Sequence, residues 1–184
     1  MTRRPAILRL AVAAVCLFAV PPVAMASLVR ALDLAELTRE ADQVVVGDVL
    51  SVRAAWDSEH RNIHTTIEIG VREIWKGAPP SGGRVTIRQL GGTVGEIEMT
   101  VLGMPTFSEG ERALLFLRRS QVAGMAQGKR NLRWEGSGKR WLADAANHAE
   151  SVTIDSRGKL QAVGPGRAEP LDSLREQILD LAGK

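Results

Sequence analysis

Alternation of apolar and polar residues with a period of two dominates the middle of the chain. From Ile63 to Val71 the odd positions are apolar or threonine and the even positions are polar or glycine. This is the pattern of a half-buried antiparallel strand. Residues 84–89 and 97–101 alternate in the same way, and residues 44–52 are rich in valine. The pattern therefore predicts a mainly β protein.

Three further features refine this prediction. Residues 113–117 are apolar without interruption, so we expect that strand to be covered on both faces. Gly47, inside the valine-rich strand, indicates a bulge or a close approach of another backbone. Glycine-rich turns at 135–138 and 155–158 predict two hairpins, within residues 132–142 and 152–163.

Helices are expected at both ends of the β region. Asp33 is a good cap, and Leu34, Leu37 and Ala41 follow it on one face of a short helix. Near the C-terminus, Ser173 and Glu176 have the spacing of a capping box. The apolar face of that second helix consists of Leu174, Ile178 and Leu181.

Two tryptophans stand near the ends of the first two long strands. We expect Trp56 and Trp75 to lie near the same open end of a hairpin centred on residues 59–62, as core residues. Together these elements predict one domain over residues 27–184, with no internal repeat. Its fold class is mainly β: an OB-like, closed or strongly bent antiparallel barrel of about six to nine strands, with a short N-terminal helix and a C-terminal amphipathic helix.

The first 26 residues have the layout of a secretory signal peptide. Three arginines precede an uncharged run from Leu10 to Val20, and Ala24-Met25-Ala26 fits the site of signal peptidase cleavage. The run has 11 residues, whereas about 20 are needed to cross a bilayer. We therefore expect an exported protein, periplasmic or extracellular, without a transmembrane anchor in its mature form.

Removal of this segment changes what the charge indicates. The whole chain has 24 basic and 21 acidic residues, but all three excess arginines lie in the first 26 positions. The mature chain of 158 residues is formally neutral and contains no cysteine, because Cys16 leaves with the signal peptide. A basic nucleic-acid-binding protein and a disulfide-stabilised scaffold are therefore not expected.

Neither a metal site nor a catalytic site is predicted. Asp57, His60 and His64 lie close together in sequence, but their period-two surroundings do not place the two imidazoles on one helical face. The chain has no G-x-S-x-G or H-E-x-x-H motif, and residues 91–95 lack the Lys-Ser/Thr of a phosphate-binding loop. We expect no cofactor.

The most informative cluster lies between positions 118 and 140, where seven basic residues and one acid give a local charge of +6. Trp134 within this segment and Trp141 directly after it could stack on sugars or bases. The candidate binding surface consists of Arg118, Arg119, Lys129, Arg130, Arg133, Trp134, Lys139, Arg140 and Trp141. The alternative is that the basic side chains follow the solvated faces of a hairpin and the tryptophans belong to the core.

Five motifs stand out within residues 33–130: 41–49, 73–77, Gly91-Gly92 with 103–107, 109–117 and 124–129. In these motifs the chain resembles an uncharacterised family of exported bacterial proteins. Its opening part resembles, more distantly, the OB-type barrel of netrin-like and tissue-inhibitor-of-metalloproteinase-like domains, which implies a five-stranded barrel with flanking helices. Inhibitors of that fold act through an N-terminal cysteine, and the mature chain here would begin with Ser27. No inhibitory residue is therefore carried over.

The leading hypothesis is a non-enzymatic exported module that binds an extracytoplasmic partner through the segment 118–140. Outside the cytoplasm, that partner would be an envelope polysaccharide, a lipid headgroup or a protein rather than a nucleic acid. The alternatives are a regulator or accessory domain of secreted proteases, and a hydrolase with an unrecognised site.

Overall fold

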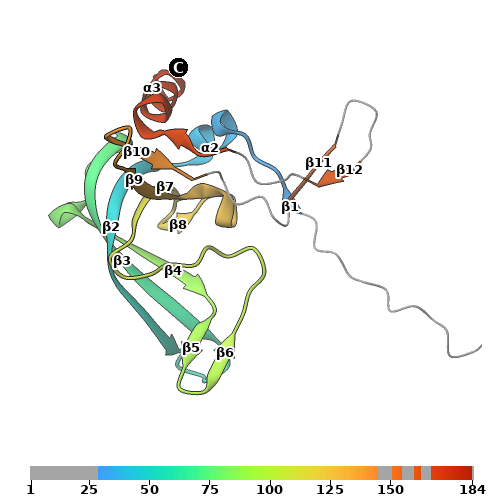
Figure 1. Cartoon of the computed structure of the whole chain (residues 1–184). Coiled ribbons are helices and arrows are strands. Elements are labelled where there is room, and N and C mark those ends of the chain that lie inside the picture. Colours follow the sequence, from blue (N-terminus) through green and yellow to red (C-terminus); the bar gives the residue numbers. More distant parts are fainter. Residues whose placement is uncertain (1–28, 145–150, 155–159, 163–166, 184) are drawn as a thin grey trace, which may run out of the picture.

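The structure is a computed structural model that describes residues 29–144, 151–154, 160–162 and 167–183. The predicted signal peptide and the turn 155–158 lie outside these residues. Within these residues, the α-helices α2 (Leu34–Glu40) and α3 (Leu171–Ala182) and the 3-10 turns η1 (Ser81–Gly83) and η2 (Met125–Gly128) accompany the strands (Figure 1). The strands are β1 (Val29–Arg30), β2 (Gln43–Trp56), β3 (Ile63–Lys76), β4 (Arg84–Leu90), β5 (Gly92–Val94), β6 (Ile97–Met99), β7 (Arg112–Arg118), β8 (Gln121–Val122), β9 (Lys129–Glu135), β10 (Arg140–Ala143), β11 (Ser151–Ile154), β12 (Leu160–Ala162) and β13 (Glu169–Pro170).

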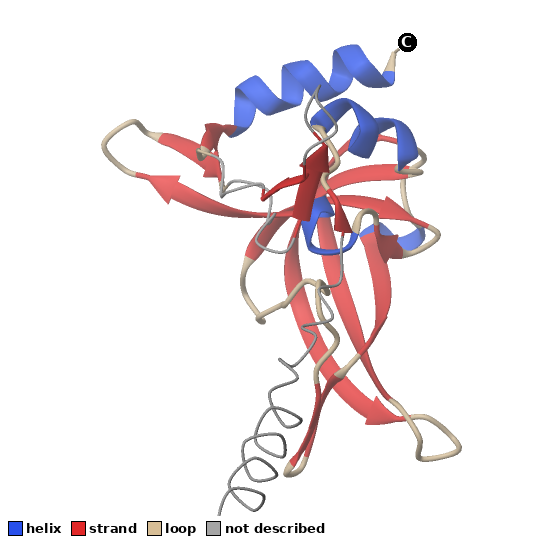
Figure 2. Cartoon of the chain, turned by 90° about the vertical axis from the view of Figure 1, so that its right-hand side faces the viewer, coloured by secondary structure: helices blue, strands red, loops and turns tan. Residues whose placement is uncertain are grey.

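An eight-stranded antiparallel sheet organises the molecule. Its strands follow the order β13-β10-β9-β7-β2-β3-β4, and β8 pairs with β7 beside this path. Both helices lie on one side of this sheet (Figure 2). The predicted mainly β architecture with two helices and antiparallel strands is confirmed. The sheet is bent so far that β4 approaches β8, but no ladder joins these strands in the described part of the chain, so the sheet stays open.

Alternate residues of the central strands belong to two separate hydrophobic cores, one on each face of the sheet. Val44, Leu114 and Phe116 face the helices, where they pack with Leu174 and other side chains of α2 and α3. Val45, Val49, Ile67, Ile87, Leu115 and Leu117 face the concave side of the bent sheet. Every residue from 113 to 117 is buried. The prediction that this strand is covered on both faces is therefore confirmed, and it explains why no polar residue interrupts it.

Gly47 lies at an irregularity of the long β2–β3 hairpin, as its position in the strand predicts. The register between the two strands shifts between Val46 and Gly47. A Cβ at Gly47 would lie 2.5 Å from Ile69 Cγ2 and 2.7 Å from the Gly70 carbonyl oxygen. The absence of a side chain thus allows the two backbones to approach.

The two helices begin differently. At α2 the prediction is confirmed: the Glu36 amide donates to Asp33 Oδ1 at 2.7 Å, and the Asp33 amide donates to Glu36 Oε2 at 3.1 Å. At α3 the predicted cap at Ser173 is wrong, because the helix begins at Leu171, directly after Pro170. Ser173 therefore lies inside the first turn, but Leu174 and Ile178 are buried as predicted.

The two tryptophans of the β2–β3 hairpin lie at its opposite ends, and the prediction of a shared end is wrong. Trp56 pairs with Ile63 beside the connecting turn, where it stacks on His60 at a centroid distance of 6.3 Å. Trp75 precedes Lys76, which pairs with Val44 at the far end. Trp75 is buried in the core beneath the helices.

Candidate functional site

Asp48 binds two arginines. It lies on the side of the sheet that faces the helices, just beyond the part that the helices cover. It lies opposite Arg112 in the β2–β7 ladder. Arg112 donates to both carboxylate oxygens, from Nε to Oδ1 at 2.6 Å and from an Nη to Oδ2 at 3.3 Å. Arg72, on β3, donates to Oδ2 from the other side. The hydrogen bonds from Arg112, and then those from Arg72, lower the pKa of Asp48, whereas burial acts in the opposite direction.

Arg112 in turn supports an aromatic pair. Its guanidinium carbon lies 4.5 Å from the ring centroid of Trp141, a cation–π contact. Trp141 and Trp134 are direct partners in the β9–β10 ladder. Their ring centroids are 5.6 Å apart at an interplanar angle of 63°, an edge-to-face arrangement. We call Arg112, Trp134 and Trp141 the tryptophan surface.

The hairpin turn fixes the register that makes the two tryptophans partners. Glu135 pairs with Arg140 across the turn, and Arg140 Nε donates to Glu135 Oε2 at 2.9 Å. Gly136 and Gly138 lie between them, and Lys139 closes the turn with a φ of 49°. With this register, Trp134 and Trp141 extend from the same face of the ribbon.

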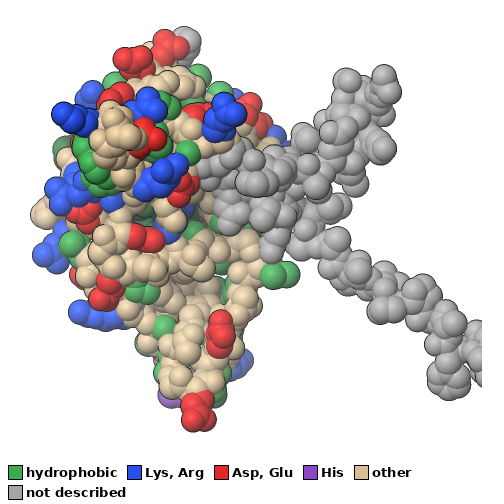
Figure 3. All heavy atoms as spheres, in the orientation of Figure 1, with side chains coloured by type: hydrophobic (Ala, Val, Ile, Leu, Met, Phe, Trp, Pro, Cys, Tyr) green, Lys and Arg blue, Asp and Glu red, His purple; other side chains and the backbone are tan. Residues whose placement is uncertain are grey.

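The outer tryptophan is open to solvent. Trp134 is 54% exposed, whereas Trp141 is partly buried against the core beneath the helices. In Figure 3, hydrophobic side chains gather at the end of the β9–β10 hairpin, with basic and acidic side chains around them. One face of this surface is thus anchored in the core, and the other meets water.

The structure divides the nine residues of the predicted binding segment among three environments. The β9–β10 hairpin carries Trp134, Lys139, Arg140 and Trp141, and Arg133 directly precedes Trp134 in β9. Most of their charge is balanced, because Arg140 pairs with Glu135 and Arg133 pairs with Asp144 at 3.2 Å. The local charge of +6 read along the sequence therefore does not persist as a basic field at this surface.

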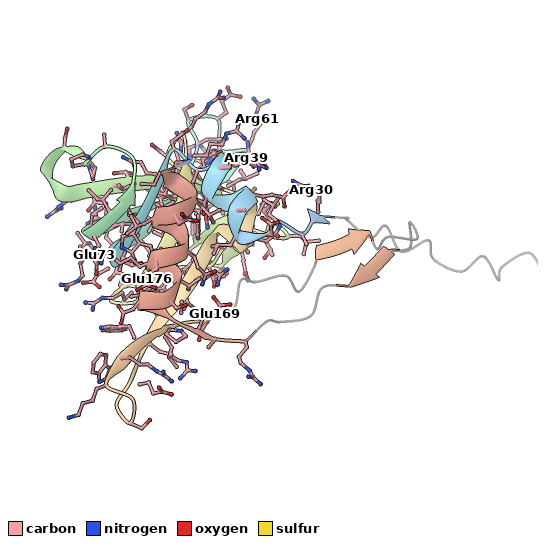
Figure 4. The ribbon with its side chains drawn as sticks, turned by 90° about the horizontal axis from the view of Figure 1, so that it is seen from above. Arg30, Arg39, Arg61, Glu73, Glu169 and Glu176 are labelled. Carbon is pink, nitrogen blue, oxygen red and sulfur yellow. The ribbon has the colours of Figure 1, made fainter. Side chains whose placement is uncertain are left out.

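Two of the predicted residues are buried. The Lys129 ammonium contacts the Thr106 carbonyl and lies 2.6 Å from Glu111 Oε1, and it also lies over the ring of Phe107 at 4.5 Å. Arg130 extends from the other face of β9 and lies 3.8 Å from Glu169. Glu169 belongs to β13, directly before α3 (Figure 4). Burial lowers the pKa of Arg130, and the nearby Glu169 raises it. Both residues contribute to the packing of the fold and are not part of the exposed binding surface.

Arg118 and Arg119 lie at the far end of the sheet from the hairpin. They stand at the C-terminal end of β7, whereas the hairpin extends beyond Arg112 at the other end of that strand. Six extended residues span about 20 Å. Arg119 belongs to the turn between β7 and β8, where its amide donates to Asp42 Oδ2 at 2.8 Å. These two arginines therefore do not join the tryptophan surface.

The residues weighed as metal ligands have a different role. Asp57 accepts hydrogen bonds from the amides of Glu59, Arg61 and Asn62, and so shapes the β2–β3 turn. These bonds, led by that from Arg61, lower the pKa of Asp57. Within the described ranges, no group of three or more His, Cys, Asp or Glu side chains could hold a metal ion.

Sequence reasoning missed Asp48, Arg72 and Arg112. Asp48 is a charged residue within a run of valines, and Arg112 opens an otherwise apolar strand. Such a charge is a signal that a partner lies nearby. The register that brings the two together cannot be deduced from the residues of either strand alone.

The arrangement defines the class of protein at a coarse level: an open, bent antiparallel sheet with an aromatic and cationic surface at one hairpin. None of the helices in the described part of the chain has the length and apolar character needed to cross a membrane. No protein-family model matches the sequence. No curated protein matches it either.

Proposed function

We propose that the protein is an exported, non-enzymatic binding module that contacts an envelope polysaccharide through the tryptophan surface. The observation that carries this proposal is the 54% exposure of Trp134, on an edge-to-face pair whose inner member is anchored on Arg112 and the core. An indole left in water is unfavourable, and tryptophan and arginine are enriched where proteins bind partners.

Rigidity supports a binding role. The chain of contacts from Arg72 through Asp48 and Arg112 to Trp141 holds the inner ring, and the β-ladder holds Trp134 opposite it. A ligand therefore meets a surface that is already ordered. Less conformational entropy is lost on binding to such a surface than to mobile side chains.

The character of the tryptophan surface favours a sugar polymer as the ligand. A sugar ring has an apolar C–H face that packs on an indole and hydroxyls at its edge that exchange hydrogen bonds. Arg112 supplies a guanidinium beside Trp141. Residues 133, 135 and 140 alternate with the tryptophans, so the ion-paired Arg140, Glu135, Arg133 and Asp144 lie on the reverse face of the ribbon. Because these four form two neutral pairs, the ligand would bind mainly by stacking and hydrogen bonding rather than through a net positive field.

Affinity electrophoresis tests this proposal. Wild-type protein should be retarded in a native gel that contains the envelope polysaccharide of the producing cell, and Trp134→Ala should migrate as in the empty gel. Leu102→Ala is the matched control, because Leu102 is 64% exposed and belongs to the loop after β6, away from the β9–β10 hairpin. Equal retardation of the wild type and Trp134→Ala would contradict the proposal.

Export and the relation to known folds belong to the same proposal. The N-terminal layout of arginines, apolar run and Ala24-Met25-Ala26 supports secretion of the chain. The approach of β4 to β8 supports an OB-like barrel that lacks its closing ladder. Both agree with the resemblance of residues 33–130 to exported bacterial proteins.

A further inference from the structure

A pocket of about 520 Å³ lies at the seam of the bent sheet, where β4 approaches β8. Its volume falls in the range of small-molecule sites, about 300–1,000 Å³. The seam lies beside the Leu117 end of β7, where Val122 of β8 pairs, whereas the tryptophan surface lies beyond Arg112 at the other end of that strand. Its apolar lining comes from β4, the loop before β7, β8 and η2: Ile87, Leu90, Met104, Pro105, Val122 and Met125.

The seam is too narrow for an additional strand. Cα atoms of β4 and β8 come within 8 Å of each other. A strand that paired with both neighbours would need them about 9.6 Å apart, twice the usual spacing. The open edge of β4 therefore does not accept a polypeptide that would close the sheet. A slender molecule can lie between the side chains instead.

The polar lining favours an anionic head group. Arg88 and His64 line the pocket, and none of the aspartates and glutamates that the structure describes does. Because Arg88 pairs with Thr66 and Leu90 pairs with His64, Arg88 and His64 extend from the same outer face of the sheet. Among the described residues Arg88 has no ion-pair partner, and it is exposed. A cation thus stands at the rim of an apolar pocket.

Gln89 adds an unmet acceptor on the inner side. Its Nε2 donates to the Pro105 carbonyl at 2.9 Å. Its Oε1 is buried, and no donor in the described part of the chain reaches it. A buried acceptor without a donor is unfavourable, and a hydroxyl on a bound molecule would satisfy it. Because Gln89 follows Arg88 in a strand, the two side chains point to opposite faces, and such a hydroxyl would lie away from the anionic head.

We propose that the seam between β4 and β8 binds an amphiphile of the fatty-acid class. The carboxylate pairs with Arg88 at the rim, and the acyl chain lies along Ile87 and Val122. Met104 and Met125 adapt to the chain because methionine is flexible and polarizable. A hydroxyl further along the acyl chain donates to Gln89 Oε1. This site is independent of the tryptophan surface and of the proposed polysaccharide.

Displacement of the fluorescent fatty acid cis-parinaric acid from purified protein tests the proposal. Laurate should displace the probe, an analogue with a hydroxyl in the middle of its chain should bind more tightly, and dodecanol, which lacks the carboxylate, should bind more weakly. Arg88→Gln should weaken laurate about tenfold, which is typical of losing one charge-assisted hydrogen bond. It should leave dodecanol unchanged.

Arg84→Gln is the matched control, since Arg84 is also an exposed arginine of β4 but does not line the pocket. It should bind laurate as the wild type does. Val122→Trp should fill the seam and abolish binding, with the far-ultraviolet circular dichroism spectrum of the wild type showing that it has folded. The proposal is overturned if laurate fails to displace the probe from the wild type. It is also overturned if Arg84→Gln and Arg88→Gln bind laurate equally.

Discussion

Asp48 and Arg112 face each other across β2 and β7 and are joined by two hydrogen bonds, at 2.6 and 3.3 Å. The pair links the β2–β3 hairpin, through Arg72, to the ring of Trp141. The surface proposed to bind a ligand is therefore attached to the most extensively paired part of the sheet. A change at Asp48 should alter both the stability of the fold and the order of the tryptophan surface.

Asp48→Asn should lower the free energy of unfolding at neutral pH by about 2 kcal/mol, because hydrogen bonds from charged groups are worth about 1.5–3 kcal/mol. The pKa of Asp48 is lower in the folded protein than in the unfolded chain. Its stabilising contribution is thus complete above the unfolded-state value of about 3.9 and is lost as the pH falls through the folded-state value. The difference in unfolding free energy between wild type and variant should shrink below about pH 4.

Urea unfolding at several pH values measures this difference. Glu96→Gln is the control, because Glu96 is an exposed carboxylate in the turn between β5 and β6. The free energy of unfolding of Glu96→Gln should equal that of the wild type at every pH. A gap between wild type and Asp48→Asn that stays constant through the acidic range would show that Asp48 does not act through its charge.

Lys129→Ala should lower the free energy of unfolding by about 3 kcal/mol, because it leaves the partly buried Glu111 without its counter-ion. It also removes the donor to the Thr106 carbonyl and the cation over Phe107. Amide hydrogen exchange in residues 103–107 should therefore accelerate more than exchange in β2.

The double variant Lys129→Met with Glu111→Gln tests whether the ion pair explains the loss of stability in Lys129→Ala. It removes both charges and keeps most of the packing volume, so much of the lost stability should return. If the double variant is as unstable as the sum of the single changes, the ion pair is not what Lys129 contributes.

Gly47→Ala should lower the free energy of unfolding by about 2 kcal/mol, because the new Cβ would collide with Ile69 and with the carbonyl of Gly70. Gly136→Ala is the matched control: a Cβ at Gly136 meets nothing within 4 Å, and its stability should stay within about 0.5 kcal/mol of the wild type. Thermal unfolding of both variants decides the matter, and equal melting temperatures would refute the close approach of β2 and β3.

Local patterns predicted the elements of the fold well, because strand and helix periodicity follow from which side of an element is buried. The alternation of residues 63–71, the unbroken apolar run 113–117 and the cap at Asp33 all correspond to observed features. The start of α3 was mispredicted because the helix begins directly after Pro170, which occupies the N-cap position without a side-chain hydrogen bond, so the helix needs no cap at Ser173. Trp56 and Trp75 were placed together because the clear alternation ends at Val71. The hairpin continues to Lys76, so Trp75 lies at the end far from Trp56.

The site was predicted only in part, because proximity along the chain is not proximity in a sheet. Trp134 and Trp141 meet because a short turn joins their strands, which the sequence Glu135 to Gly138 indicates. Arg118 is near them in sequence but stands at the other end of β7. Arg112 and Asp48 come from segments 64 residues apart, and only the strand order brings them together.

The most direct test of the account is the affinity of the purified protein for the envelope polysaccharide, measured by titration calorimetry at low and at high salt. Trp134→Ala should weaken binding about thirtyfold, the loss of about 2 kcal/mol expected for a central tryptophan, and Leu102→Ala should match the wild type. Because the ion pairs at the hairpin neutralise one another, salt should change the wild-type affinity only slightly. Unaltered affinity of Trp134→Ala, or binding that disappears at high salt, would contradict a contact made by stacking on the tryptophan surface.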